Sequence, residues 1–96
     1  MTMALRTTKF DIQDHLKTPE EQASYIEAAL ETEDPSFIAV ALGDIARARG
    51  VTAFARETGL SRETIYKTFR EGGNPTLETL TRATRALGLR LKVVST

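Results

Sequence analysis

Apolar residues in this chain recur mostly three or four positions apart, the spacing that gathers them on one face of an α-helix. The first such stretch follows Thr18-Pro-Glu-Glu21, where Thr18 can cap a helix, Pro19 suits its first turn and Glu21 can complete a capping box. The second follows Asp34-Pro35 and ends at Gly50. We therefore predict helices from Pro19 to about Thr32 and from Pro35 to Gly50. The residues that recur at helical spacing in the first helix are Gln22, Ile26, Ala29 and Leu30. The apolar stripe of the second helix is Ile38, Ala41, Leu42 and Ile45.

The stretch from Val51 to Arg70 predicts two short helices joined by a tight turn. Thr52 can cap the first helix, Ala53 to Thr58, and Gly59 suits a left-handed turn. Ser61 can cap the second helix, which we expect to run from Arg62 to about Arg70. The apolar positions that would fill the angle between the helices are Phe54, Ala55, Leu60, Ile65 and Phe69. This arrangement is typical of a helix-turn-helix.

The remaining segments predict a closing helix and a strand. The closing helix should begin near Thr76, with Asn74 as the alternative cap, and end at Gly88. Its expected buried face is Leu77, Leu80, Thr84 and Leu87. From Leu89 to Val94 apolar and basic residues alternate, which indicates a half-buried strand that needs a partner from another chain. At the other end, Phe10, Ile12 and Leu16 favour a short helix or docking turn.

Three positions of the central motif carry a resemblance to a known family. Ala55, Gly59 and Ile65 occupy the places of the small residue, turn glycine and buried aliphatic of the Cro/repressor-type (XRE-like) helix-turn-helix. The flanking segments 34–50, 73–80 and 85–91 resemble those of addiction-module antidote proteins, so the similarity extends from about Lys9 through most of the chain. The resemblance implies a mostly α, five-helix Cro/repressor-like helix-turn-helix domain with a short C-terminal β-strand. It also implies the antitoxin of a type II toxin–antitoxin module, which binds a RelE/ParE-like toxin and represses its own operon.

Charge divides the chain into an acidic front and a basic back, although the 13 basic and 13 acidic residues cancel overall. Residues 1–46 carry three basic and nine acidic residues, a net charge of −6, and residues 47–96 carry ten and four, a net charge of +6. This asymmetry indicates two different partners, although a merely solubilising surface is the alternative for the acidic half. We expect residues 1–33 to form an N-terminal arm with an acidic helix, and residues 34–96 to form the helix-turn-helix domain with the strand.

The second helix of the motif is the predicted DNA-reading element, with its N-terminal residues at base edges in the major groove. Arg62 and Lys67 can donate to guanine, and Glu63 can accept from cytosine. Residues suited to phosphates are Thr64, Tyr66, Arg70 and the backbone near Thr52. The full set of candidate DNA-binding residues is Thr52, Ser61, Arg62, Glu63, Thr64, Tyr66, Lys67 and Arg70. The alternative is that these are ordinary solvated residues of a packed helix pair.

Composition favours neither an enzyme nor a metal protein. Cysteine is absent and His15 is the single histidine, so neither a nucleophile–base pair nor a metal-ligand set is visible, and we expect no cofactor. No apolar run approaches the roughly 18 residues of a membrane span, and the N-terminus lacks the apolar core of a signal peptide. We therefore expect a cytoplasmic protein.

Two functional hypotheses follow, and they differ in their partners. An antitoxin would bind a palindromic operator and a toxin, with the acidic residues Glu20, Glu27, Glu31 and Glu33 as candidates for the toxin surface. A stand-alone phage-type repressor would use the N-terminal helices only to complete its fold; a pure interaction module is the third and weaker possibility. In either regulator, Leu89, Leu91 and Val93 are expected to pair with the same segment of a second copy. The alternative is that this strand extends the sheet of the toxin.

Overall fold

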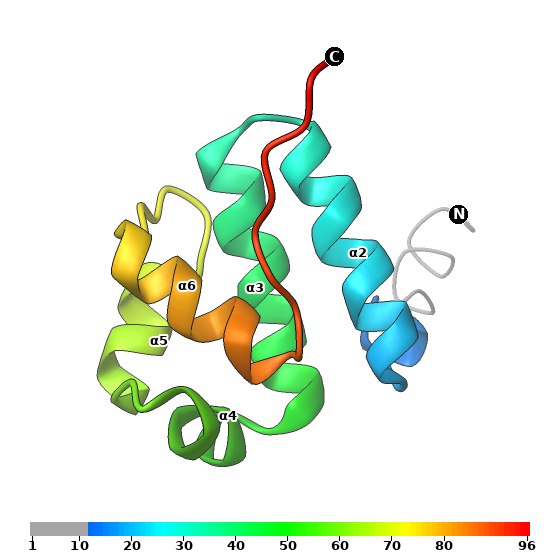
Figure 1. Ribbon diagram of the computed structural model, residues 1–96. Helices are drawn as coiled ribbons and strands as arrows, with labels where there is room; N and C mark the ends of the chain where they lie inside the picture. The colour runs from blue at the N-terminus through cyan, green and yellow to red at the C-terminus, as the bar shows by residue number, and fades with distance from the viewer. Residues whose placement is uncertain (1–11) are drawn as a thin grey trace, which may run out of the picture.

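A computed structural model describes residues 12–96 as a short 3₁₀-helix followed by five α-helices (Figure 1). The elements are η1 (Ile12–His15), α2 (Pro19–Glu31), α3 (Pro35–Arg49), α4 (Val51–Thr58), α5 (Arg62–Thr68) and α6 (Leu77–Ala86). The predicted mostly helical, five-helix class is confirmed over this range. The predicted docking turn corresponds to η1 and the buried Leu16, whereas Phe10 lies outside the described residues.

Side-chain caps fix where most of these helices begin. The Thr18 hydroxyl accepts the Glu21 N–H at 3.1 Å, and the Glu21 carboxylate accepts the Thr18 N–H at 3.0 Å, so the predicted capping box is present. The N–H groups of Lys17 and Thr18 also hold the pKa of Glu21 below its usual value. Asp34, Ser61 and Thr76 cap α3, α5 and α6 in the same way. These local contacts confirm four of the predicted caps, Thr18, Asp34, Ser61 and Thr76, with Thr76 rather than Asn74 starting α6.

Helix α3 is the centre of the fold, with α2 packed on one side and α4 and α5 on the other (Figure 1). Its central turns are almost fully buried, and α2 adds Ile26 and Ala29 to the same apolar cluster. The other buried members of the cluster are Leu16, Ala41, Leu42, Ile45, Ala46, Phe54, Ile65, Phe69 and Ala83. The predicted division at residue 33 stays a prediction, but α2 and α3 share one core.

Polar contacts join α2, α3 and α4 around this core. The Tyr25 hydroxyl donates to Asp44 at 2.7 Å, and Arg47 donates to the other oxygen of the same carboxylate. Burial and this hydrogen bond raise the pKa of Tyr25 to about 12, so the phenol keeps its proton and remains a donor. Arg49 donates to Gln22 at 2.8 Å and to Glu57 at 3.2 Å. The three helices are therefore held in one arrangement by directional bonds as well as by apolar packing.

Three predicted details of the helices are wrong. Helix α4 begins at Val51 with Gly50 as its N-cap, because Gly50 alone, at φ 91°, turns the chain out of α3; Thr52 lies inside the first turn and makes no cap. Helix α5 ends at Thr68, since Phe69 has the non-helical angles φ −96° and ψ 69°. Leu77 is 74% exposed because it lies in the first turn of α6, and this helix becomes buried only in its later turns, at Ala83 and Thr84.

The predicted C-terminal strand is also not formed in the described part of the chain. After Gly88, at φ 75°, only Leu89 packs against the core, and its N–H donates to the carbonyl of Thr84 at 3.0 Å. Val93 is 97% exposed. Residues 12–96 contain no other extended segment with which a ladder could close, so the tail runs unpaired from α6 toward the end of the molecule where α2 joins α3 (Figure 1).

Candidate nucleic-acid interface

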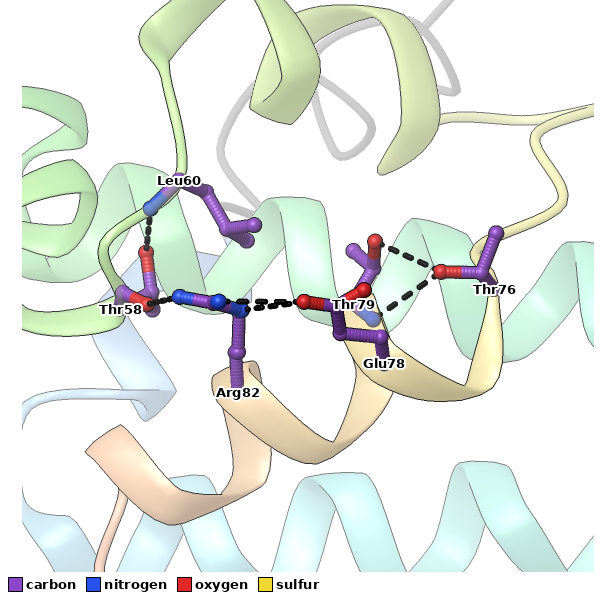
Figure 2. Close-up of polar contacts among 6 residues, drawn as sticks. All are labelled: Thr58, Leu60, Thr76, Glu78, Thr79 and Arg82. Atoms are coloured by element: carbon purple, nitrogen blue, oxygen red, sulfur yellow. Dashed lines mark hydrogen bonds and ion pairs between the residues drawn. The ribbon is translucent and has the colours of Figure 1, made fainter.

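The connection between α4 and α5 is a tight turn whose shape is set by Thr58 and Gly59. The Thr58 hydroxyl donates to the carbonyl of Phe54 at 2.8 Å. The same hydroxyl accepts the N–H of Leu60 at 3.1 Å (Figure 2). Gly59 has φ 77°, in the left-handed region that was predicted for it. A left-handed residue directly after α4 reverses the chain within three residues, and Ser61 then caps α5.

Apolar contacts hold α5 in the angle formed by α3 and α4. Ile65 and Phe69, four positions apart, are each 2% exposed. The rings of Phe69 and Phe54 meet edge to face with centroids 6.4 Å apart. Phe54, Ile65 and Phe69, which were predicted to fill the angle between the two helices of the motif, are all buried in one apolar cluster.

A close backbone approach fixes the far end of α5, and the sequence pattern did not reveal it. Gly43, in the middle of α3, faces the carbonyl of Phe69 so closely that a Cβ added at residue 43 would lie 2.2 Å from that oxygen. Nearby, the N–H of Gly72 donates to the Ser36 hydroxyl at 2.9 Å. The end of α5 and the following loop are thus anchored on α3. Because Gly43 looks like any small residue in a helix, only its tertiary contact distinguishes it.

The solvent-facing side of α5 gathers most of the predicted DNA-binding residues. Arg62, Glu63 and Lys67 are exposed on α5, and Arg70 is exposed just beyond its end. The Tyr66 side chain is also largely in solvent, with 54% of its surface exposed. Ser61 and Thr64 are engaged with each other, since the Ser61 hydroxyl accepts the Thr64 N–H at 3.0 Å. The face therefore presents three cations, one carboxylate and one aromatic ring to solvent.

The start of α4 and the end of α3 adjoin this face. A small cavity of about 60 Å³ lies between these two helix ends and α5. Its lining includes Arg47, Val51, Tyr66 and Arg70. Among the described residues, no side chain caps the start of α4, where the exposed Thr52 lies. The position of Arg47 brings a further cation beside α5. The sequence pattern gave no signal that Arg47 and Arg70 line the same cavity, since 23 positions separate them.

The remaining candidate residues lie elsewhere. Glu20, Glu27, Glu31 and Glu33 are all exposed, in or just after α2. Helix α2 lies on the side of α3 that faces away from α5 (Figure 1). Leu91 and Val93 are exposed in the tail, whereas Leu89 is half-buried. The structure therefore brings the DNA-binding candidates together and keeps the acidic candidates apart from them.

Comparison with known proteins places this architecture in a family. A family model described as "Probable addiction module antidote protein" matches residues 6–95. The chain belongs to this family. This chain is also 42% identical over 84 residues to an uncharacterized protein of Haemophilus influenzae, covering 88% of this chain and 87% of that protein. No solved structure matches.

Two further observations bear on the chemistry of the antidote protein. Among residues 12–96 no group of three or more His, Asp or Glu side chains is arranged to hold a metal ion. Within the same range, no helix is both long and apolar enough to cross a membrane.

The substitution Gly43→Ala tests whether the α3–α5 contact fixes the position of α5. Helix propensity alone would make this change stabilising by about 1 kcal/mol. Because the new methyl group meets a backbone oxygen, we expect a net loss of about 1–3 kcal/mol in the free energy of unfolding, measured by urea denaturation. Ala28→Gly, at an exposed position of α2, is the control for propensity and should cost about 1 kcal/mol. A Gly43→Ala protein as stable as the wild type would show that α3 and α5 are not in tight contact.

Proposed function

We propose that the antidote protein is the antitoxin of a type II toxin–antitoxin module, which neutralises a RelE/ParE-like toxin by direct binding and represses its own operon through DNA binding by α5. Membership of the antidote family is the observation that carries the antitoxin assignment. The α4–turn–α5 unit supports the DNA-binding assignment, as a helix-turn-helix of the Cro/repressor type. Both activities require a protein that works beside its operon in the cytoplasm.

In the proposed DNA complex, the exposed face of α5 enters the major groove. Arg62 and Lys67 then donate to guanine, and Glu63 accepts from cytosine. Tyr66, Thr64 and Arg70 contact phosphates, and the free N–H groups at the start of α4 provide a further phosphate contact near Thr52. The net charge of +6 over residues 47–96 favours this orientation toward a polyanion, even though the whole chain is neutral.

The proposed toxin surface is the exposed face of α2. Glu20, Glu27 and Glu31 project from a helix that lies away from α5, so toxin and DNA can be bound at the same time. An acidic helix complements a basic toxin, which is the expected charge of this toxin class. A stand-alone repressor is the second candidate, and one observation favours it. Ile26 and Ala29 of α2 complete the core, so this helix has a structural role even without a toxin.

We further propose that the antidote protein acts as a homodimer joined by its C-terminal tail. Leu91, Val93 and Val94 leave an apolar edge in solvent, and their backbone groups form no ladder within the described chain. Antiparallel pairing with a second tail would satisfy both copies at once. A two-fold dimer would then present two α5 helices to a palindromic operator, about 34–36 Å apart. The competing arrangement adds the tail to the sheet of the toxin.

The DNA proposal predicts different effects for the residues of α5. Arg62→Ala and Lys67→Ala should each weaken binding to the protein's own promoter by about 1–3 kcal/mol and relax base preference. Arg70→Ala should weaken binding to all sequences alike and reduce the salt dependence. Fluorescence titration measures both effects, with Lys17→Ala as a control for charge far from α5. Wild-type affinity in all three variants would remove α5 from the interface.

The toxin proposal predicts that charge reversal on α2 weakens toxin binding. Glu27 and Glu31 are exposed and outside the core, so Glu27→Lys/Glu31→Lys should leave the fold intact. We expect at least a tenfold weaker affinity, about 1.4 kcal/mol, for the small basic protein encoded beside this gene, measured by calorimetry. Glu71→Lys, beyond α5, is the matched control. Equal affinity of the double variant and wild type would place the toxin on another surface.

The dimer proposal predicts that the toxin-free protein is dimeric at micromolar concentration. Leu91→Pro removes a ladder donor together with an apolar side chain, so it should shift the mass measured by light scattering toward the monomer. Ser95→Pro changes the same tail outside the apolar alternation and should leave the mass unchanged. A monomeric wild type, or a Leu91→Pro protein that dimerises as well as wild type, would exclude the tail as the dimer seam.

A further inference from the structure

The guanidinium of Arg82 lies against the turn between α4 and α5 (Figure 2). Its Nη1 donates to the carbonyl of Thr58 at 3.4 Å, while Nε and Nη2 donate to one oxygen of Glu78 at 3.2 and 3.1 Å. The Thr58 carbonyl is one of the last four of α4, which have no partner within the helix. We propose that Arg82 is a positioning residue that holds this turn and thereby sets the direction in which α5 leaves it. The role rests on the proposed DNA-binding function of α5.

Because residue 59 is glycine, the guanidinium of Arg82 can lie against the turn without having to shift. A Cβ at position 59 would lie 2.9 Å from Nη1 of Arg82. Gly59 therefore serves two purposes, since it supplies the left-handed φ and also admits a cation at the C-terminal end of α4, where the helix dipole favours positive charge. Two hydrogen bonds therefore stabilise the turn. The Thr58 hydroxyl accepts the Leu60 N–H within the turn, and Arg82 of α6 donates to the Thr58 carbonyl.

Glu78 fixes the orientation of the guanidinium. The two residues are four apart on α6, and Glu78 engages Nε and Nη2, which leaves Nη1 directed at the turn (Figure 2). The pair is largely solvent-exposed, with the Arg82 side chain at 42% and that of Glu78 at 74%, so it contributes little to overall stability. Its effect should therefore appear in the placement of α5 rather than in the melting temperature.

Because of how the helices pack, α6 can influence the position of α5 through the turn between α4 and α5. Helix α6 packs mainly on α4, and α5 packs mainly on α3 and α4. Arg62 and Glu63 follow Gly59 by only three and four residues, so a small rotation at the turn displaces both side chains. Recognition of base edges requires placement to within about 0.5 Å, whereas contacts with phosphates tolerate more.

The test compares Arg82→Ala and Glu78→Gln with the control Arg85→Ala, which removes the same charge from an exposed position of α6. Binding is titrated on a duplex from the protein's own promoter and on an unrelated duplex. We expect Arg82→Ala and Glu78→Gln to lose about tenfold in affinity for the promoter, about 1.4 kcal/mol. On the unrelated duplex Arg82→Ala should behave like Arg85→Ala. All three proteins should melt within a few degrees of wild type.

The two substitutions change the net charge in opposite directions, which separates positioning from simple electrostatics. If Arg82 acted only as a positive charge near DNA, Glu78→Gln would strengthen binding while Arg82→Ala weakened it. That outcome would overturn the proposal, as would equal losses for Arg82→Ala and Arg85→Ala on the promoter.

A second measurement does not depend on DNA. Amide hydrogen exchange at Leu60, whose N–H donates to Thr58, should be faster in Arg82→Ala and Glu78→Gln than in Arg85→Ala. If the wild type binds no promoter DNA, the proposed function fails and this exchange alone decides whether Arg82 holds the turn. Unchanged exchange at Leu60 in both variants would overturn the positioning role.

Discussion

The contact between Gly43 and the carbonyl of Phe69 is the constraint on which the arrangement of the helices depends. It brings the backbone of α3 and the end of α5 closer together than any residue with a Cβ would permit. At this separation Ile65 and Phe69 reach the core beside Leu42 and Ile45, and Phe54 meets Phe69 edge to face. A wider gap would leave voids around these side chains, and voids are costly in a core this small. The distance between the end of α5 and α3 is therefore set by backbone proximity first and by side-chain packing second.

Local chemistry explains why so much of the helical framework was predictable. Thr18 with Glu21, Asp34, Ser61 and Thr76 each act within three residues of their own position, so the sequence contains both partners of every cap. The errors arise where the outcome depends on distant residues. Thr52 had the right chemistry for a cap, but the single-residue link at Gly50 moved the helix start ahead of it. Leu77 had the right spacing for burial, but the first turn of α6 leaves it in solvent. The C-terminal strand had the right alternation but no partner in the described chain.

The candidate site divides in the same way. The exposed residues of α5 could be predicted because Ile65 and Phe69 fix which face is buried, and the opposite face follows from helical geometry. The roles of Gly43, Arg47 and Arg82 could not be predicted, because each depends on a residue more than 20 positions away. Gly43 faces the carbonyl of Phe69, Arg47 lines a cavity with Arg70, and Arg82 donates to the carbonyl of Thr58. The spacing of residues along a helix shows which face is exposed. The contacts that fix the direction of that face depend on the tertiary structure.

The placement of α2 and α5 on different sides of α3 has an electrical consequence. The chain has no net charge, yet among its described residues exposed carboxylates gather on α2 and exposed cations on α5, so the charge distribution is dipolar. A neutral dipole gains little long-range attraction to a polyanion, but it experiences a torque in the field of one. Within the screening length of roughly 8 Å at physiological salt, the field of a phosphate backbone would turn such a molecule so that its basic side leads. The charges of the protein would therefore orient it near a polyanion rather than raise its concentration there.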